Sequence, residues 1–292
     1  GMDAGCQVLF SGGTGGEGDG GVGRWQEFFE AGNQGGKRIA SICHTRPSGA
    51  FFGLAQLSPF TAKSPAWREL MKLPTIADRV AHMKKEYVRK ALIEEGISAG
   101  DMRGLARMIH PFGTDVTPDL DFDRKQSLAQ LAEAEGRDPV ETYVDRLIAS
   151  EGREYFNMWM FGGNLENQWN YMRLPHVVPM LGDAGAHVGF FTDTDSPTVL
   201  LSELTRKQGV YTLEEAIHRI TGKSAEIIGL KERGQLQEGW HADINVINYE
   251  KLGTRHAEYL NDFPHGGGRF SVKSTGYDAT IVAGNVVVRN CE

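Results

Sequence analysis

The strongest candidate for chemistry is Asp183, which follows a short apolar run and opens a glycine-rich turn. The run at 177–181 is typical of a buried strand in a parallel sheet, and the letters GDAG at 182–185 follow it directly. A carboxylate at the C-terminal end of such a strand lies where α/β enzymes usually hold reactive groups, and it can accept a proton from water. On this local pattern alone, a structural Asp that stabilises the turn is an equal alternative.

A second set of polar side chains follows another predicted strand. His44 and Arg46 come directly after the RIASIC run at 38–43, so we expect them at the same edge of the sheet as Asp183. Arg46 is a candidate clamp for a substrate carboxylate, with a buried structural ion pair as an equal alternative. His44 is a further candidate for substrate binding. His187 could line the same site or bond only to the loop backbone.

Three other polar features have weaker functional interpretations. The glycine-rich segment 12–23 carries no Gly-Lys-Ser/Thr signature, which favours a mobile loop or flexible coil over a nucleotide site. Ser11 has no base identified beside it, which disfavours a serine nucleophile. Asp193 and Asp195 are predicted to cap the helix that begins at Ser196 rather than to bind metal.

The composition indicates a globular protein with a substantial core. The chain has 292 residues, of which 40% are hydrophobic. Its formal net charge of −7 argues against a nucleic-acid partner, and no apolar run is long enough to predict a membrane span. The three cysteines are scattered and form no CxxC motif, which favours a reducing, cytoplasmic location.

The order of predicted elements in the first half is that of an α/β protein. A strand at 6–10, a helix at 25–31 and the strand at 38–43 form a βαβ unit, which predicts parallel strands. The stretch 51–161 is predicted to be largely helical.

Capping signals locate the helices within that stretch. Thr75 and Asp78 predict the start of one helix that ends near Gly96, and Asp138 predicts the N-cap of another. The segment 101–123, which contains His110, is predicted to be irregular.

The character of the chain changes near residue 230. A capping box at Thr212 opens the last predicted helix. Strand-like pieces then follow at 242–248 and 280–289, the second folding about Gly284-Asn285 as a hairpin. We therefore predict an α/β domain over residues 1–230 and a small β domain segment over 231–292.

Several segments carry a resemblance to a known family through their order as well as their composition. They are RPSGAFFGLAQLSPF (46–60), SLAQLAEAEGRDPVETYVDRLI (127–148), GDAGAH (182–187), SPTVLLSEL (196–204), TLEEAIHRITGKSAEIIGL (212–230), KERGQLQEGWHADINVIN (231–248) and TIVAGNVVVRN (280–290). In this order they resemble the C-terminal half of the amidohydrolase superfamily. Within it the chain is most similar to the N-acyl-D-amino-acid deacylase branch, also called D-aminoacylases.

The resemblance implies a fold and a reaction. The implied fold is a (β/α)8 TIM-like barrel with a small β-sandwich domain, and the implied reaction is metal-dependent hydrolysis of the amide bond of an N-acyl-D-amino acid or a similar linear amide. In that family the Asp of strand eight lies beside a zinc ion and takes a proton from the attacking water. Asp183 is the matching position, so it is implied to be both catalytic and a metal-site residue.

The chain also departs from the family pattern. The nine histidines include no His-x-His pair, and Ser11-Gly12 stands where the sixth barrel strand would present Ser-His. We therefore expect a fragment with about strands six to eight of the barrel and the C-terminal part of the β-sandwich. Zinc is expected in the complete enzyme and is expected to be absent or weakly bound in this chain.

An incomplete barrel would expose sheet edges and apolar surface. We therefore expect the chain to form homo-oligomers. The missing upstream ligands also leave an alternative to an enzyme, namely a non-catalytic scaffold or oligomerisation module.

Overall fold

The computed structural model describes residues 6–14, 21–36, 38–55, 58–99, 104–113, 126–160, 164–182, 184–190 and 193–291, without the side chain of His256. Asp183 and the middle of the glycine-rich segment therefore lie outside the described residues.

Three parallel strands form the sheet that positions the candidate site. They are β1 (Val8–Ser11), β2 (Ile39–His44) and β6 (Val177–Leu181), in the order β1-β2-β6. Both β1 and β6 pair with β2 in parallel, and α1 (Val22–Gly32) connects β1 to β2. The βαβ unit predicted from the sequence is therefore confirmed.

Both faces of β2 are covered, which explains why most of its residues are apolar. Ile39 and Cys43 pack in one hydrophobic cluster with Phe29 of α1. Ala40 packs on the other face with Ile227, which belongs to α11 (Gly222–Ile228). A strand covered on both faces is fixed in position, so the residues at its C-terminal end have a rigid base.

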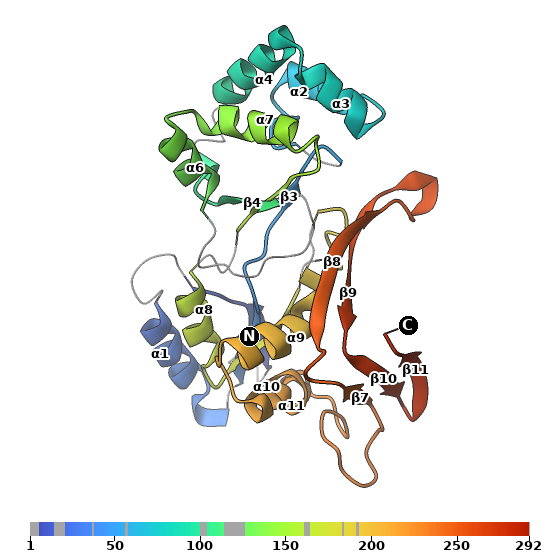
Figure 1. Ribbon diagram of the computed structural model, residues 1–292. Coiled ribbons are helices and arrows are strands. Elements are labelled where there is room, and N and C mark those ends of the chain that lie inside the picture. Colours follow the sequence, from blue (N-terminus) through green and yellow to red (C-terminus); the bar gives the residue numbers. More distant parts are fainter. Residues whose placement is uncertain are drawn as a thin grey trace.

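A helical layer follows the second strand and packs on a small antiparallel sheet (Figure 1). Its helices are α2 (Pro65–Met71), α3 (Ile76–Met83), α4 (Glu86–Ser98), α6 (Leu128–Glu135) and α7 (Pro139–Ala149). The sheet has the order β3-β5-β4 and consists of β3 (Phe51–Phe52), β5 (Tyr155–Met158) and β4 (Ile109–Gly113).

Two predictions for this layer need correction. The expected single helix from Thr75 to Gly96 is two helices, because the backbone of Lys85 is extended and ends the helical path after α3. Part of the segment expected to be irregular is strand β4, where His110 stacks on Trp159 with ring centroids 3.7 Å apart. A strand with Pro111 in it is tolerated because β4 is at the edge of its sheet.

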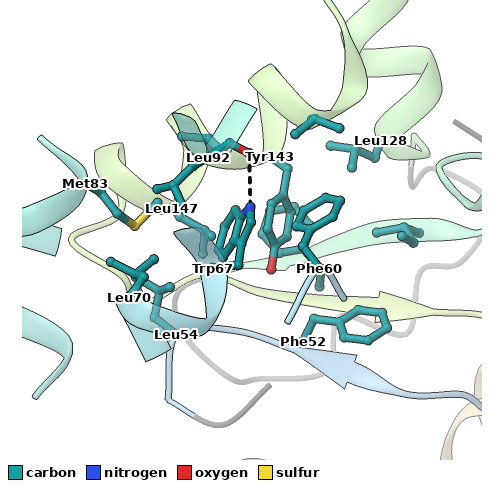
Figure 2. Close-up of a cluster of buried hydrophobic side chains, with 14 of the residues drawn as sticks. Phe52, Leu54, Phe60, Trp67, Leu70, Met83, Leu92, Leu128, Tyr143 and Leu147 are labelled. Atoms are coloured by element: carbon teal, nitrogen blue, oxygen red, sulfur yellow. Dashed lines mark hydrogen bonds between the residues drawn. The ribbon is translucent and has the colours of Figure 1, made fainter. Parts of the chain in front are cut away.

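The largest hydrophobic cluster lies between these helices and the β3-β5-β4 sheet (Figure 2). Trp67 is fully buried, and its Nε1–H donates to the carbonyl oxygen of Leu92 at 3.1 Å. Its ring centroid lies 5.1 Å from Phe60 and 5.9 Å from Tyr143. The hydrogen bond satisfies the one polar atom of the indole, so the ring can be buried without an orphaned donor.

Helices also cover the β1-β2-β6 sheet. These are α8 (Leu165–Met172), α9 (Ser196–Val199) with its π-helical extension (Leu200–Lys207), α10 (Leu213–Ile220) and α11. The capping box of Thr212 and Glu215 is present at the start of α10. Within the described ranges, we find no helix long and apolar enough to cross a membrane.

The C-terminal part is built from antiparallel strands. β7 (Ile244–Ile247), β10 (Tyr277–Val282) and β11 (Asn285–Arg289) form a sheet of order β11-β10-β7. The predicted hairpin is confirmed, with its turn at Ala283-Gly284 instead of one residue later. Both turn residues have positive φ, 47° and 80°, as tight hairpin turns require.

A second hairpin, not predicted from the sequence, packs against earlier segments of the chain. It consists of β8 (Gly253–Leu260) and β9 (Arg269–Thr275), and it extends along one side of the molecule (Figure 1). Phe270 of β9 packs with Phe51 and Phe112, and its backbone N–H donates to the carbonyl oxygen of Val188 at 3.0 Å. The domain boundary near residue 230 remains a prediction.

Candidate active site

A buried carboxylate, Asp193, joins the C-terminal ends of β2 and β6. Asp193 is 2% exposed and begins the short 3-10 turn η4 (Asp193–Asp195). Its Oδ1 accepts the backbone N–H of Ala184 at 2.7 Å, and its Oδ2 accepts the hydroxyl of Ser48 at 2.8 Å. Nδ1 of His44 lies 3.3 Å from the same Oδ2. Asp193 therefore ties the end of β2 to the turn that follows β6.

Arg46 lies in a buried ion pair beside this network. Its Nε and Nη2 donate to Oδ1 of Asp195 at 3.2 and 3.0 Å, and both residues are almost fully buried. The sequence allowed either a substrate clamp or a buried ion pair for Arg46, and this contact is such an ion pair. A substrate carboxylate would have to compete with Asp195 for the guanidinium. Oδ2 of Asp195 has no hydrogen-bond partner among the residues that the structure describes.

The electrostatics of Asp195 follow from its burial. Loss of water raises the pKa of the Asp195 carboxyl, and the charge of Arg46 lowers it only in part. The nearby Asp193 carboxylate adds to the upward shift. Arg46 is therefore the main group that favours the ionised form of Asp195.

The two carboxylates do not cap helix α9 with their side chains, which corrects that prediction. Asp195 is the N-cap residue but makes no side-chain capping bond. The hydroxyl of Ser196 instead donates to the backbone carbonyl oxygen of Asp193 at 2.9 Å. The carboxylate of Asp195 instead accepts charge-assisted bonds from Arg46, and the carboxylate of Asp193 accepts the backbone N–H of Ala184.

The end of β2 is also held from helix α8. Nε2 of the buried Gln168 donates to the carbonyl oxygen of His44 at 2.8 Å. This bond adds to the contact with Asp193, so both the backbone and the ring of His44 are positioned.

A steric limit explains why residue 12, directly after β1, is a glycine. The backbone N–H of Gly12 donates to the carbonyl oxygen of Ile42 at 2.9 Å. A Cβ at Gly12 would collide with the hydroxyls of Tyr171 and Ser41, which are bonded to each other at 2.8 Å. No larger residue fits at this strand end unless both Tyr171 and Ser41 move.

The remaining predicted site residues follow β6 in the sequence. Asp183 is outside the described residues, but its neighbours Gly182 and Ala184 are described on either side of it. His187 is exposed, and its ring centroid lies 5.3 Å from that of Phe190 in the same turn. Its contact with substrate stays a prediction.

The described side chains do not form a complete metal site. Across those residues, no group of three His, Cys, Asp or Glu side chains is arranged to hold a metal ion. His44 and Asp193 supply two such groups. A zinc ion therefore does not fit the described part of the chain on its own, and it would need donors outside that part.

The Asp193 network leads to a prediction about the turn. In Asp193→Ala, the amide of Ala184 loses its acceptor, and we expect its hydrogen exchange to become at least about tenfold faster, since an unpaired buried donor costs about 1–3 kcal/mol. Amide exchange followed by NMR measures this rate. Asp193→Asn is the matched control, because its side-chain oxygen can still accept this bond. Equal exchange rates in Asp193→Ala and the unchanged protein would show that the contact does not order the turn.

Sequence reasoning missed Asp193 as a site residue, together with Ser48 and Gln168. The signal for Asp193 was present, because the acidic run DTD lies in the connection that follows β6. The same residues stand directly before a helix, where Asp is a common cap. The donors that decide between the two roles come from distant segments of the chain.

Comparisons with known proteins show the family of the chain. Residues 75–288 match the family model described as "Amidohydrolase family". The chain belongs to the amidohydrolase family. An N-acyl-D-aspartate deacylase of Alcaligenes xylosoxydans xylosoxydans is 47% identical over 51 residues, which is 18% of this chain and 10% of that protein. A dihydroorotase of Lactobacillus acidophilus is 33% identical over 73 residues, which is 25% of this chain and 17% of that protein.

Solved structures similar to this amidohydrolase chain include two deacylases. One is a D-aminoacylase studied for its binuclear metal centre, with a TM-score of 0.48, 15% identity, and coverage of 98% of this chain and 47% of that chain. The other is an N-acyl-D-glutamate deacylase of Bordetella bronchiseptica complexed with zinc and a phosphonate inhibitor, with a TM-score of 0.48, 16% identity and coverage of 98% and 48%. The chain spans about half the length of these structures.

Proposed function

We propose that this chain is part of an amidohydrolase that cleaves the amide bond of N-acyl-D-amino acids or similar linear amides. The observation that carries the proposal is the family match over residues 75–288. The 51-residue similarity to an N-acyl-D-aspartate deacylase supports the choice of substrate class. The three parallel strands β1, β2 and β6 fit three strands of a (β/α)8 barrel, which is part of the same proposal.

Asp183 is the proposed proton acceptor. It comes two residues after the end of β6 in the sequence, which supports a position at the C-terminal edge of the parallel strands. In the reaction, the carboxylate of Asp183 takes a proton from the attacking water and delivers it to the leaving nitrogen, so that the amide becomes a carboxylic acid and an amine.

The buried network supports that role by holding the backbone beside the base. The bond from the N–H of Ala184 to Asp193 is one residue from Asp183, and Asp193 is also held by Ser48. A base that is positioned before substrate binds needs less reorganisation during the reaction. We propose His44, Arg46 and His187 as substrate-binding residues, with Arg46 exchanging Asp195 for the substrate carboxylate.

Zinc is part of the proposal for the whole protein and not for the described side chains alone. When bound, zinc would lower the pKa of a water molecule and make it a better nucleophile. Asp183 is the one metal-site residue that we propose from this chain.

Two further properties stay proposals. The sheet β11-β10-β7 exposes Val246, Val282, Val286 and Val287, each at 43% or more, which supports self-association. The free cysteines Cys6, Cys43 and Cys291 fit a cytoplasmic location.

A hydrolysis assay with paired substrates tests the function. The protein as encoded, including any sequence that adjoins these residues, is supplied with zinc and given N-acetyl-D- and N-acetyl-L-amino acids. We expect release of free D-amino acid, little release of L-amino acid, and loss of activity after treatment with a chelator. No hydrolysis of any N-acyl amino acid by the zinc-supplied protein would contradict the proposal and favour a non-catalytic scaffold.

A further inference from the structure

A cavity of about 480 Å³ lies at the opposite ends of the strands that carry the candidate active site. Gln7, Arg38 and His176 line it, and each of them directly precedes one of the strands β1, β2 and β6. Helix α11 and the residues that follow it, up to Lys231, form the other wall. The cavity therefore lies at the N-terminal edge of the sheet, away from the network around Asp193.

The charge of this cavity is opposite to that of the chain. Among the residues that the structure describes, its walls carry four basic side chains, Arg38, His176, Lys223 and Lys231, and one acidic side chain, Glu226. The whole chain has a formal net charge of −7, so its composition does not predict a basic cavity. The basic residues come from three separate segments, which means that the fold brings them together.

Two of these cations are available to a ligand. Glu226 is paired with Lys223, whose Nζ lies 3.1 Å from Oε2 of Glu226. Within the part of the chain that the structure describes, neither Arg38 nor Lys231 makes an ion pair with an acidic side chain. A concave wall with one sign of charge concentrates ions of the opposite sign.

The pKa of His176 depends on the charges in the cavity. Burial lowers the pKa of its imidazole, Lys223 lowers it further, and Glu226 acts in the opposite direction. Its ring also contacts Phe29, with ring centroids 5.8 Å apart. An anion that entered the cavity would favour the protonated imidazole and raise its pKa.

We propose that this cavity binds a small molecule through a phosphate group. A doubly charged phosphate accepts several charge-assisted hydrogen bonds at once, which suits a guanidinium and ammonium groups that approach from different walls. Ile39, Ala40, Ile227 and Leu230 supply an apolar surface for the rest of the molecule. This site is separate from the proposed amide hydrolysis and does not depend on it.

Binding of inorganic phosphate to the protein as encoded, including any sequence that adjoins these residues, tests the site. We expect saturable binding in isothermal titration calorimetry, and we expect the NMR titration midpoint of His176 to move to higher pH as phosphate is added. The double variant Arg38→Ala/Lys231→Ala should weaken binding by about tenfold or more, since it removes two charge-assisted contacts. Both side chains are exposed, so the fold should survive their truncation.

The control variant is Lys72→Ala, which removes an exposed lysine from the surface pair with Glu69 in another part of the molecule. Equal phosphate affinity in the double variant and the control would overturn the proposal, as would an absence of saturable binding. A second titration with succinate separates the ligand classes. Tighter binding of the dicarboxylate than of phosphate would overturn the choice of a phosphate group.

Discussion

Replacing Asp183 with asparagine is expected to lower kcat/KM for an N-acyl-D-amino acid by about 10²–10⁴-fold, which is the usual contribution of a positioned proton acceptor. Asparagine has nearly the same size as aspartate, but its amide cannot accept the proton of the attacking water. The thermal unfolding midpoint should stay close to that of the unchanged protein, because the substitution preserves the shape of the turn. Steady-state kinetics and thermal unfolding measure the two expectations.

The combination of results separates the two interpretations of Asp183. Asp278→Asn is the matched control, because Asp278 is an exposed aspartate of strand β10. Unchanged turnover in Asp183→Asn would remove Asp183 from the mechanism. A large loss of stability would identify Asp183 as the structural turn residue that the local pattern also allowed.

Replacing Arg46 with alanine should lower the free energy of unfolding by about 3–5 kcal/mol at neutral pH, because it leaves an uncompensated charge in the interior. Asp195 is 3% exposed, and Nε and Nη2 of Arg46 both donate to a single oxygen of this carboxylate. Urea unfolding measures the loss. Lys72→Ala, which breaks the exposed pair with Glu69, should cost only about 0–1 kcal/mol.

The loss of unfolding free energy in Arg46→Ala is expected to be larger at neutral pH than at acidic pH. Burial already raises the pKa of Asp195, and removal of Arg46 raises it further. When the pKa of a carboxyl is higher in the folded state than in the unfolded state, the protein loses stability as pH rises from the unfolded-state pKa through the folded-state pKa. The difference in unfolding free energy between Arg46→Ala and the unchanged protein should therefore shrink as pH falls toward about 4. The double variant Arg46→Met/Asp195→Asn should recover most of the loss. A loss that is independent of pH would indicate that missing packing, and not the buried charge, is the cause.

The sequence predicted the elements whose signals are local. The apolar run at 177–181 and the βαβ order of the first 45 residues correspond to β6, β1, α1 and β2, because buried parallel strands need apolar residues on both faces. The capping box at Thr212 predicted the start of α10 for the same local reason. The break at Lys85 was not predictable in this way, since the helical periodicity continues through it.

The sequence by itself also determined which residues follow the strand ends. His44 ends β2, Arg46 stands two residues later, and Asp183 comes after β6 in the sequence, so parallel strands are expected to bring these positions to one edge of a sheet. The tertiary structure decided what the polar groups do there. Asp193 accepts hydrogen bonds from Ala184, 9 residues away, and from Ser48, 145 residues away. Asp195 accepts hydrogen bonds from Arg46, 149 residues away. A local pattern cannot tell a capping carboxylate from a buried one, because the choice depends on donors that only the folded chain brings within reach.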